Sequence, residues 1–283
     1  MSCKKKDHIA LPNATLSKFV ESGKTTFSYI DLTNGDIKTK GPSMYEKEKG
    51  YYLEYFDNIC QYFETWIGNS RKTISSVDSS TNNLIYDRDE LKQIIVELIS
   101  LQWIRRKELI ETIMDADKGN ERISQIESDM FNSGRINASV INKIHEYRNM
   151  LANDKQKRDY FYSNADKRMA ELEQTLLNQG LDGLRATIVK IPDSIKATFL
   201  LTPYHFIMSK NMCFFVLEPR YSLALFPPKA FEPEGRETCG IWEMSNESDV
   251  EVLIPICIEM AKNCTPTHLI GEEYMLKKIQ QYL

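Results

Sequence analysis

The chain has 283 residues, of which 42% are hydrophobic and 27% charged, and its formal net charge is −4 at pH 7. These proportions are close to those of ordinary globular proteins, so they favour a folded chain with a sizeable core over a disordered one. No apolar run approaches the roughly 20 residues that a membrane helix needs, and the small negative charge provides no overall attraction to nucleic acid or anionic lipid.

The cysteines and the N-terminal residues bear on the cellular compartment. The six cysteines are far apart and form no Cys-x-x-Cys pair, which is typical of reduced thiols in a cytosolic protein. The basic N-terminal residues are followed by Ile9-Ala10-Leu11-Pro12 rather than by an apolar segment, which argues against a secretory signal. The sequence therefore predicts a cytoplasmic protein without a membrane partner.

A β-hairpin is the first clear element. Residues 25–40 carry Asn34-Gly35 at the expected turn, and Asn-Gly favours positive φ at both central positions of a hairpin turn. Apolar residues at steps of four and three over residues 52–66 predict a helix with one buried face. A segment rich in Ser, Thr and Asn, residues 69–83, predicts a loop that ends this helix.

The most apolar helix is predicted next. Asp87 or Asp89 is expected to begin it, and the helical pattern continues to about Met114. Its middle third has few polar residues, so this helix should be central to the core.

Residues 115–183 are strongly polar and helical in pattern. Short breaks are expected near Gly119, Gly134 and Asn153. The apolar stripes of this region are narrow, which predicts peripheral helices rather than a second core.

The main sheet is predicted in the last third of the chain. Residues 204–208, 213–217 and 222–226 are short runs rich in aromatic and β-branched residues, and their close spacing predicts a meander. Residues 185–191 are expected to form a strand or a short helix, and residues 240–244 another strand.

The closing elements complete the predicted fold. Asp249 is expected to cap a helix over residues 250–263, and residues 269–283 are expected to form an amphipathic helix. The fold class is therefore α+β, mostly helical, with one small, largely antiparallel sheet in the C-terminal third and an N-terminal β-hairpin that could extend it. We expect a single domain over residues 1–283. Its parts are the hairpin and first helix (1–68), a helical region (84–180) and the sheet with C-terminal helices (184–283).

Common catalytic signatures are absent from the sequence. It has no glycine-rich phosphate loop, no dinucleotide-binding glycine pattern, no His-Glu-x-x-His and no Gly-x-Ser-x-Gly. Asp31, Asp36 and Lys38 are the nearest approach to a nuclease carboxylate–lysine strand, but Asp36 is an expected residue after an Asn-Gly turn. No metal-ligand set is predicted, and the sequence leaves open whether the protein is an enzyme and which cofactor it would use.

Arg105 and His8 are the strongest candidate site residues. An arginine offers a rigid fork of donors that suits phosphate or carboxylate, and Gln102 lies one helical turn earlier on the same face. Two alternatives remain for Arg105: it is a solvated charge, or it pairs with a buried carboxylate such as Glu64. His8 is the histidine that we favour as a proton carrier, although any of the four could be a hydrogen-bonded structural imidazole.

Several segments, in order, resemble an uncharacterised bacterial domain-of-unknown-function family, number 4238, over nearly the whole chain. The segments are His8 with Pro12-Asn-Ala-Thr-Leu-Ser-Lys-Phe19, the Asn-Gly hairpin, Gln102-x-x-Arg105, Phe206-Ile-Met-Ser-Lys-Asn211, Phe226-Pro-Pro-Lys229 and Asn263-Cys-Thr-Pro-Thr-His-Leu-Ile-Gly271. The chain departs from the family pattern because His8 is one residue too far from Pro12. Lys210 and Met212 also stand where the family has Asp and Pro.

The resemblance implies a role in phage defence or host conflict, because such family members are associated with mobile elements and defence loci. Our first hypothesis is an intracellular bacterial protein in which His8, Gln102, Arg105 and the turn Ser209-Lys210-Asn211 converge on a pocket for a phosphate- or nucleotide-containing ligand. If the family's turn is a carboxylate-bearing site, Lys210 means that this copy is degenerate or binds its ligand with lysine. The alternative is a non-catalytic protein-interaction module whose polar helices present a partner surface, and the third hypothesis is a metal-dependent nuclease. The expected partner is thus a nucleotide, a nucleic acid or a protein.

Overall fold

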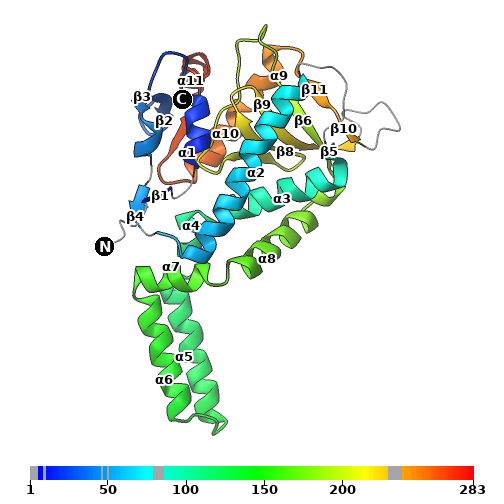
Figure 1. Cartoon of the computed structure of the whole chain (residues 1–283). Helices are drawn as coiled ribbons and strands as arrows, with labels where there is room; N and C mark the ends of the chain where they lie inside the picture. Colours follow the sequence, from blue (N-terminus) through cyan, green and yellow to red (C-terminus); the bar gives the residue numbers. More distant parts are fainter. Residues whose placement is uncertain (1–5, 9–10, 46, 50, 79–85, 229–237) are drawn as a thin grey trace.

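The computed structural model describes residues 6–8, 11–45, 47–49, 51–78, 86–228 and 238–283. Within these residues the fold is α+β, and helices predominate, as the sequence predicts. A five-stranded sheet lies between two layers (Figure 1). One face is covered by α2 (Glu54–Asp78), α3 (Arg88–Ile104) and α8 (Ala165–Asn178), and the other by α10 (Ile254–Lys262), α11 (Glu273–Gln280) and a smaller sheet. No helix in these ranges combines the length and apolarity required to cross a bilayer.

The five-stranded sheet has the order β11-β6-β9-β8-β7 and is antiparallel except for the parallel β11–β6 pair. The predicted meander and the neighbouring strands are confirmed. The strands are β6 (Arg185–Lys190), β7 (Phe206–Ser209), β8 (Met212–Glu218), β9 (Tyr221–Phe226) and β11 (Ile241–Glu243).

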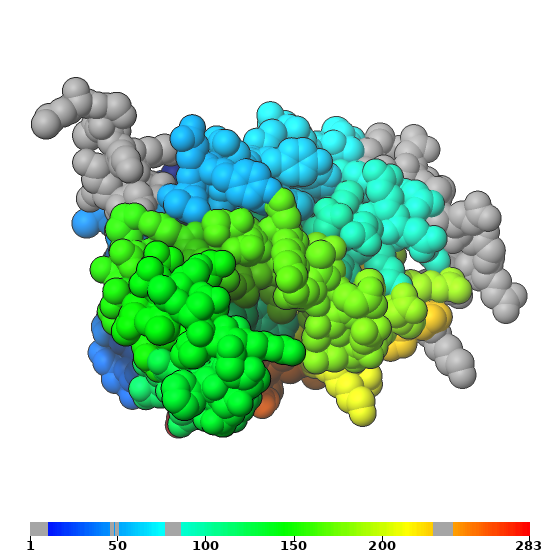
Figure 2. All heavy atoms as spheres, turned by 90° about the horizontal axis from the view of Figure 1, so that it is seen from below, coloured from blue at the N-terminus to red at the C-terminus, as the bar shows by residue number. Residues whose placement is uncertain are grey.

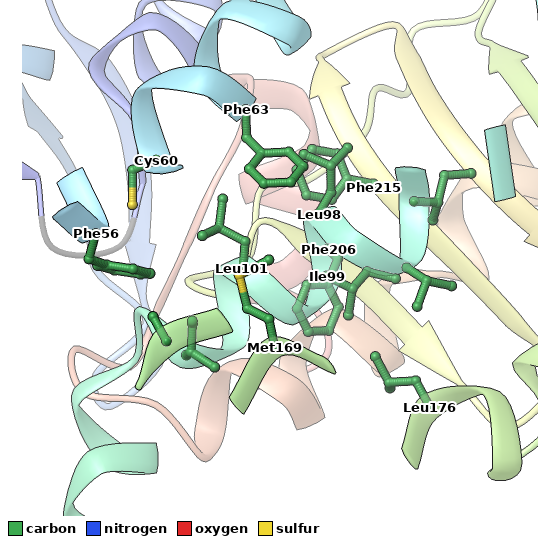
Figure 3. Packing of buried hydrophobic residues seen from close by; sticks show 14 of the residues in the cluster. Phe56, Cys60, Phe63, Leu98, Ile99, Leu101, Met169, Leu176, Phe206 and Phe215 are labelled. Carbon is green, nitrogen blue, oxygen red and sulfur yellow. The ribbon is translucent and has the colours of Figure 1, made fainter. Parts of the chain in front are cut away.

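Both faces of this sheet are buried along β8 and β9, which explains why these two strands are nearly continuous apolar runs. Successive residues of a strand point to opposite faces. Phe215 packs in the cluster that contains α2 (Glu54–Asp78), α3 (Arg88–Ile104) and α8 (Ala165–Asn178), whereas Phe214 packs in the cluster that contains α10 (Ile254–Lys262) and α11 (Glu273–Gln280). Figure 3 shows the first cluster, in which side chains of α2, α3 and α8 meet Phe206 and Phe215 of the sheet.

Helix α3 is buried and begins where the sequence predicts. The Asp87 carboxylate accepts hydrogen bonds from the N–H groups of Asp89 (2.9 Å) and Glu90 (3.0 Å), which is a helix N-cap. The predicted continuation to Met114 is wrong, because α3 ends at Ile104 and Arg106 has an extended backbone (φ −76°, ψ 130°) that begins α4 (Lys107–Ile113).

The end of α2 also differs from the prediction. The helix continues to Asp78, so the loop predicted for residues 69–83 is wrong over its first ten residues, and residues 79–83 lie outside the described residues. Tertiary contacts explain the extension. Arg71 is buried and donates from Nε to the Leu217 carbonyl (3.0 Å) and from Nη2 to Thr15 Oγ1 (2.9 Å), which fixes this part of α2 against the sheet.

The N-terminal hairpin, β2 (Phe27–Asp31) and β3 (Ile37–Lys40), is confirmed, but it does not extend the main sheet. It forms a separate three-stranded sheet with β12 (His268–Ile270), so the amphipathic helix predicted from residue 269 begins only at Glu273, as α11 (Glu273–Gln280). Gly35 has a positive φ of 74°, whereas Asn34 does not. The connection is a longer loop, in which Asp31 Oδ1 accepts from the Thr33 N–H and Asn34 Oδ1 accepts from the Asp36 N–H.

The polar region contains α5 (Ala116–Asn132), α6 (Ala138–Leu151) and α7 (Asp154–Tyr162) before α8. Helices α5 and α6 form a hairpin that projects from the body of the molecule (Figure 1). The predicted breaks at Gly134 and Asn153 are confirmed, but Gly119 lies inside α5. A Cβ atom at Gly119 would lie 2.5 Å from Leu151 Cδ1, so this glycine allows the close approach of α6 rather than a break.

Short elements complete the described fold. They are β1 (Lys6–His8), α1 (Asn13–Leu16), η1 (Ser17–Phe19), η2 (Pro42–Met44), β4 (Lys47–Lys49), β5 (Tyr86–Asp87), η3 (Leu181–Gly183), β10 (Thr238–Cys239) and α9 (Glu247–Glu251). Strands β1 and β4 pair with each other, as do β5 and β10.

Asn246, rather than Asp249, is the cap residue before the C-terminal helices. Its Oδ1 accepts from the Asp249 N–H (3.1 Å), and Asp249 Oδ2 accepts from the Asn246 N–H (3.3 Å), which makes a capping box. The helix predicted over residues 250–263 is divided into two helices, α9 (Glu247–Glu251) and α10.

We expect Asn246→Ala to lower the free energy of unfolding by about 1 kcal/mol in urea titrations. Ser245→Ala is the control, because only its backbone N–H bonds Asp249, and it should leave stability unchanged.

Candidate functional site

The sequence-predicted site residues lie in three places. Gln102 and Arg105 lie on the buried α3 and at its C-terminus, each about 1% exposed. Ser209 ends β7, and Lys210 and Asn211 form the exposed β7–β8 turn.

His8 is in β1, where it pairs with Lys47 of β4. The structure thus brings Gln102 and Arg105 together on one helix. The turn Ser209-Lys210-Asn211 lies at the opposite end of β7 from Phe206, which faces α3. The hypothesis that this turn joins Gln102, Arg105 and His8 in one ligand site therefore stays a prediction.

Arg105 is held in an ion pair. Its Nη1 lies 3.3 Å from Glu64 Oε1, and its Nε donates to the Tyr52 hydroxyl at 3.2 Å. The side chain of Glu64 remains 32% exposed, whereas that of Arg105 is 1% exposed. The pairing with Glu64 that the sequence left as an alternative is therefore present, and it fixes the end of α3 against α2.

Arg106 has a comparable structural position. Its Nε and Nη2 contact both carboxylate oxygens of Glu108 (3.2 and 3.0 Å), and its Nη1 donates to the Pro203 carbonyl at 3.1 Å. Glu108 Oε1 also accepts from the Thr265 N–H at 2.7 Å. Arg106 therefore joins the α3–α4 junction to the segment that precedes β7.

His205 is a buried residue whose environment the sequence does not reveal. It has a φ of 68°, the one positive value at a non-glycine residue in the described chain, and its ring lies 4.4 Å from that of Phe215. Neither ring nitrogen is in hydrogen-bonding geometry with a described group. Burial, and then the charges of Arg71 and Arg105, lower the pKa of His205 well below its ordinary value of 6.5.

Gln102 shares this lack of partners. Its side chain is buried, and neither its amide nitrogen nor its amide oxygen is hydrogen-bonded to another described group. Such groups are costly to bury and usually mark water, a ligand or strain.

The sequence pattern predicts His205 within the strand over residues 204–208, but the structure places it in a turn before β7. Thr202-Pro203 just before it is the signal for the turn, in which the His205 N–H bonds the Thr202 carbonyl at 3.0 Å.

Metal ligands do not gather in the described parts of the chain: these contain no group of three or more His, Cys, Asp or Glu side chains positioned to hold a metal ion.

One side of the α5–α6 hairpin carries an open apolar groove, which we call the apolar flank. Ile113, Ile126 and Tyr147 are 46%, 53% and 37% exposed there. In Figure 2, seen from below, the hairpin (green) is nearest the viewer. The groove is lined by Thr112, Ile113, Asp115, Lys118, Gly119, Arg122, Ile123, Ile126, Met130, Val140, Lys143, Ile144, Tyr147 and Leu151.

Three cations border the apolar flank. Lys118, Arg122 and Lys143 are exposed, and none of them forms an ion pair with a carboxylate of the described chain. Asp115 is the one acidic residue of the lining, and its carboxylate is engaged in capping α5 through the Lys118 N–H at 2.9 Å. The border of the groove is therefore positive, although the whole chain is negative.

The opposite side of the hairpin is internally bonded, and it also carries Phe131, which is 70% exposed and lies four residues after Glu127 on α5. Arg148 Nη2 lies 2.8 Å from Glu127 Oε2 and 3.3 Å from Ser124 Oγ, so these side chains join α5 and α6 across that side. The groove differs from that side in its three bordering cations, none of which is paired with a carboxylate of the described residues.

No family model, curated protein or solved structure matches the chain. The family resemblance stays a prediction.

Proposed function

We propose that the protein is a non-catalytic interaction module and that the apolar flank of the α5–α6 hairpin docks another protein. The observation that carries this proposal is the exposure of Ile113, Ile126 and Tyr147 along one groove. Contiguous apolar surface with a polar border is typical of protein-binding sites. Helix-in-groove docking uses such surfaces.

The packing of the hairpin supports the same proposal. Ile123 and Ile144 are buried between α5 and α6, so the hairpin has its own apolar contacts without Ile126 and Tyr147. The exposed residues are therefore additional to those that hold the two helices together. Helices that serve only as a spacer would be expected to have polar residues on both sides.

Photo-crosslinking in cells tests this function. A benzophenone amino acid at position 126 should crosslink to one partner protein, whereas the same residue at position 124, on the opposite side of the hairpin, should not. The partner is identified by mass spectrometry, purified and mixed with the purified chain. Ile126→Asp should abolish that binding and change the free energy of unfolding by no more than about 0.5 kcal/mol, because the side chain is exposed. Equal crosslinking from both positions would contradict the proposal.

A second candidate function is binding of a phosphate- or nucleotide-containing ligand near the end of α3, as expected for a phage-defence protein. It is favoured by the buried, unpartnered amide of Gln102, one turn from Arg105. Pyrophosphate or ATP should then raise the melting temperature of the wild type but not of Gln102→Leu. An absence of any shift in the wild type would count against this function.

A further inference from the structure

Resting on the proposed docking function, we infer that the partner presents an acidic amphipathic helix to the apolar flank. Such a helix would lie along the groove between α5 and α6, with its apolar face on Ile126 and Tyr147. Its carboxylates would lie beside Lys118, Arg122 and Lys143. The inference rests on the placement of charge around the groove.

The three cations are placed on both borders of the groove. Lys118 and Arg122 are four residues apart on α5, so they project from the same side of that helix. Lys143 is on α6, across the groove, and lies four residues before Tyr147. A helix in the groove would therefore have a positive charge on each side of its apolar face, which favours Glu or Asp at the flanking positions.

The same charges disfavour two other occupants. A second copy of the hairpin would bring Lys118, Arg122 and Lys143 close to their own equivalents, and like charges repel. A neutral apolar helix would leave the three cations without partners at the border of the interface. Charge complementarity sets partner choice in such interfaces more than it sets affinity.

A peptide titration tests the inference. The probe is an amphipathic helical peptide of about 15 residues, long enough to span the groove at 1.5 Å per residue, with Leu on one face and Glu on both sides of it. A second peptide has Lys in place of every Glu. We expect the acidic peptide to bind at least about tenfold more tightly than the basic one at low salt, and we expect this difference to shrink at high salt.

Charge reversal supplies the matched control. Lys118→Glu/Arg122→Glu/Lys143→Glu should weaken binding of the acidic peptide about tenfold. Lys155→Glu/Lys167→Glu/Lys277→Glu makes the same change in net charge at exposed lysines outside the groove and should leave binding unchanged. Circular dichroism checks that both variants fold.

The outcomes separate this inference from the proposed function. Equal binding of the acidic and basic peptides, or equal loss in both triple variants, would overturn the acidic-helix inference. Self-association through the flank, seen as a dimer in sedimentation equilibrium that Ile126→Asp dissociates, would also overturn it. In each case crosslinking from position 126 could still succeed. Failure of that crosslinking would instead remove the proposed function.

Discussion

Replacing Arg105 with alanine is expected to lower the free energy of unfolding by about 3–5 kcal/mol. The guanidinium is 1% exposed, and it contacts both Glu64 (3.3 Å) and the Tyr52 hydroxyl (3.2 Å). The substitution removes a large buried side chain and leaves its carboxylate partner alone. Urea unfolding curves measure the loss.

Glu64→Ala is expected to lower the free energy of unfolding by about 2–3 kcal/mol. This loss is smaller than that of Arg105→Ala, although the substitution leaves a buried cation. Glu64 is 32% exposed, so removing it deletes less buried surface, and Tyr52 still accepts a bond from Arg105. Arg105→Met is the matched control, because it keeps most of the volume and should cost less than Arg105→Ala. A loss below about 0.5 kcal/mol in Arg105→Ala, the size expected at a surface position, would contradict the structural role of this pair.

Acidification from pH 7.5 to pH 5 is expected to lower the free energy of unfolding by about 4 kcal/mol through two buried histidines. Burial lowers the pKa of His205 well below 6.5, and it lowers the pKa of His268, beside the Tyr45 hydroxyl, to about 4. The folded protein thus keeps both rings neutral in this range, whereas the unfolded chain protonates them below pH 6.5. Protons therefore favour the unfolded state, and stability falls as the pH falls.

Two variants isolate this effect. His205→Asn removes the titrating ring and tolerates the positive φ, and His268→Gln removes the other ring. Each should reduce the pH-dependent loss to about 2 kcal/mol. Burial raises the pKa of Glu173 and Glu272, which has the opposite sign, but this contribution is common to all variants and cancels in the difference. An unchanged pH dependence in both variants would show that the histidines titrate normally.

Elements with strong local signals could be predicted from the sequence. The meander over β7, β8 and β9 consists of apolar runs between turns, and Asp87 begins α3 as a local cap. Elements that depend on distant partners could not. Strand β12 has three residues and exists because it pairs with β2, more than 200 residues earlier in the chain. The last turns of α2 depend on Arg71 reaching the Leu217 carbonyl.

The candidate site was predictable only in part. The partner of Arg105 could be proposed because Glu64 lies on the apolar-patterned helix before it, but the sequence does not decide between an anion clamp and an ion pair. The general expectation that polar helices present a partner surface follows from composition. The apolar flank itself could not be predicted from composition, because Ile126 and Tyr147 join one surface only when α5 and α6 pack as a hairpin. His205 was missed because its positive φ arises in a turn, not a strand.

Hydrogen exchange tests the docking role of the hairpin most directly. It is measured on the purified chain alone and on the chain mixed with the purified partner that the crosslinking identifies. We expect new protection from exchange in α5 and α6, on the residues around Ile126 and Tyr147, and we expect none when Ile126→Asp is mixed with the same partner. We expect no new protection in the Lys210-Asn211 turn. Protection that appears at this turn, with α5 and α6 unchanged, would contradict the docking role of the hairpin and favour a ligand site at the end of β7.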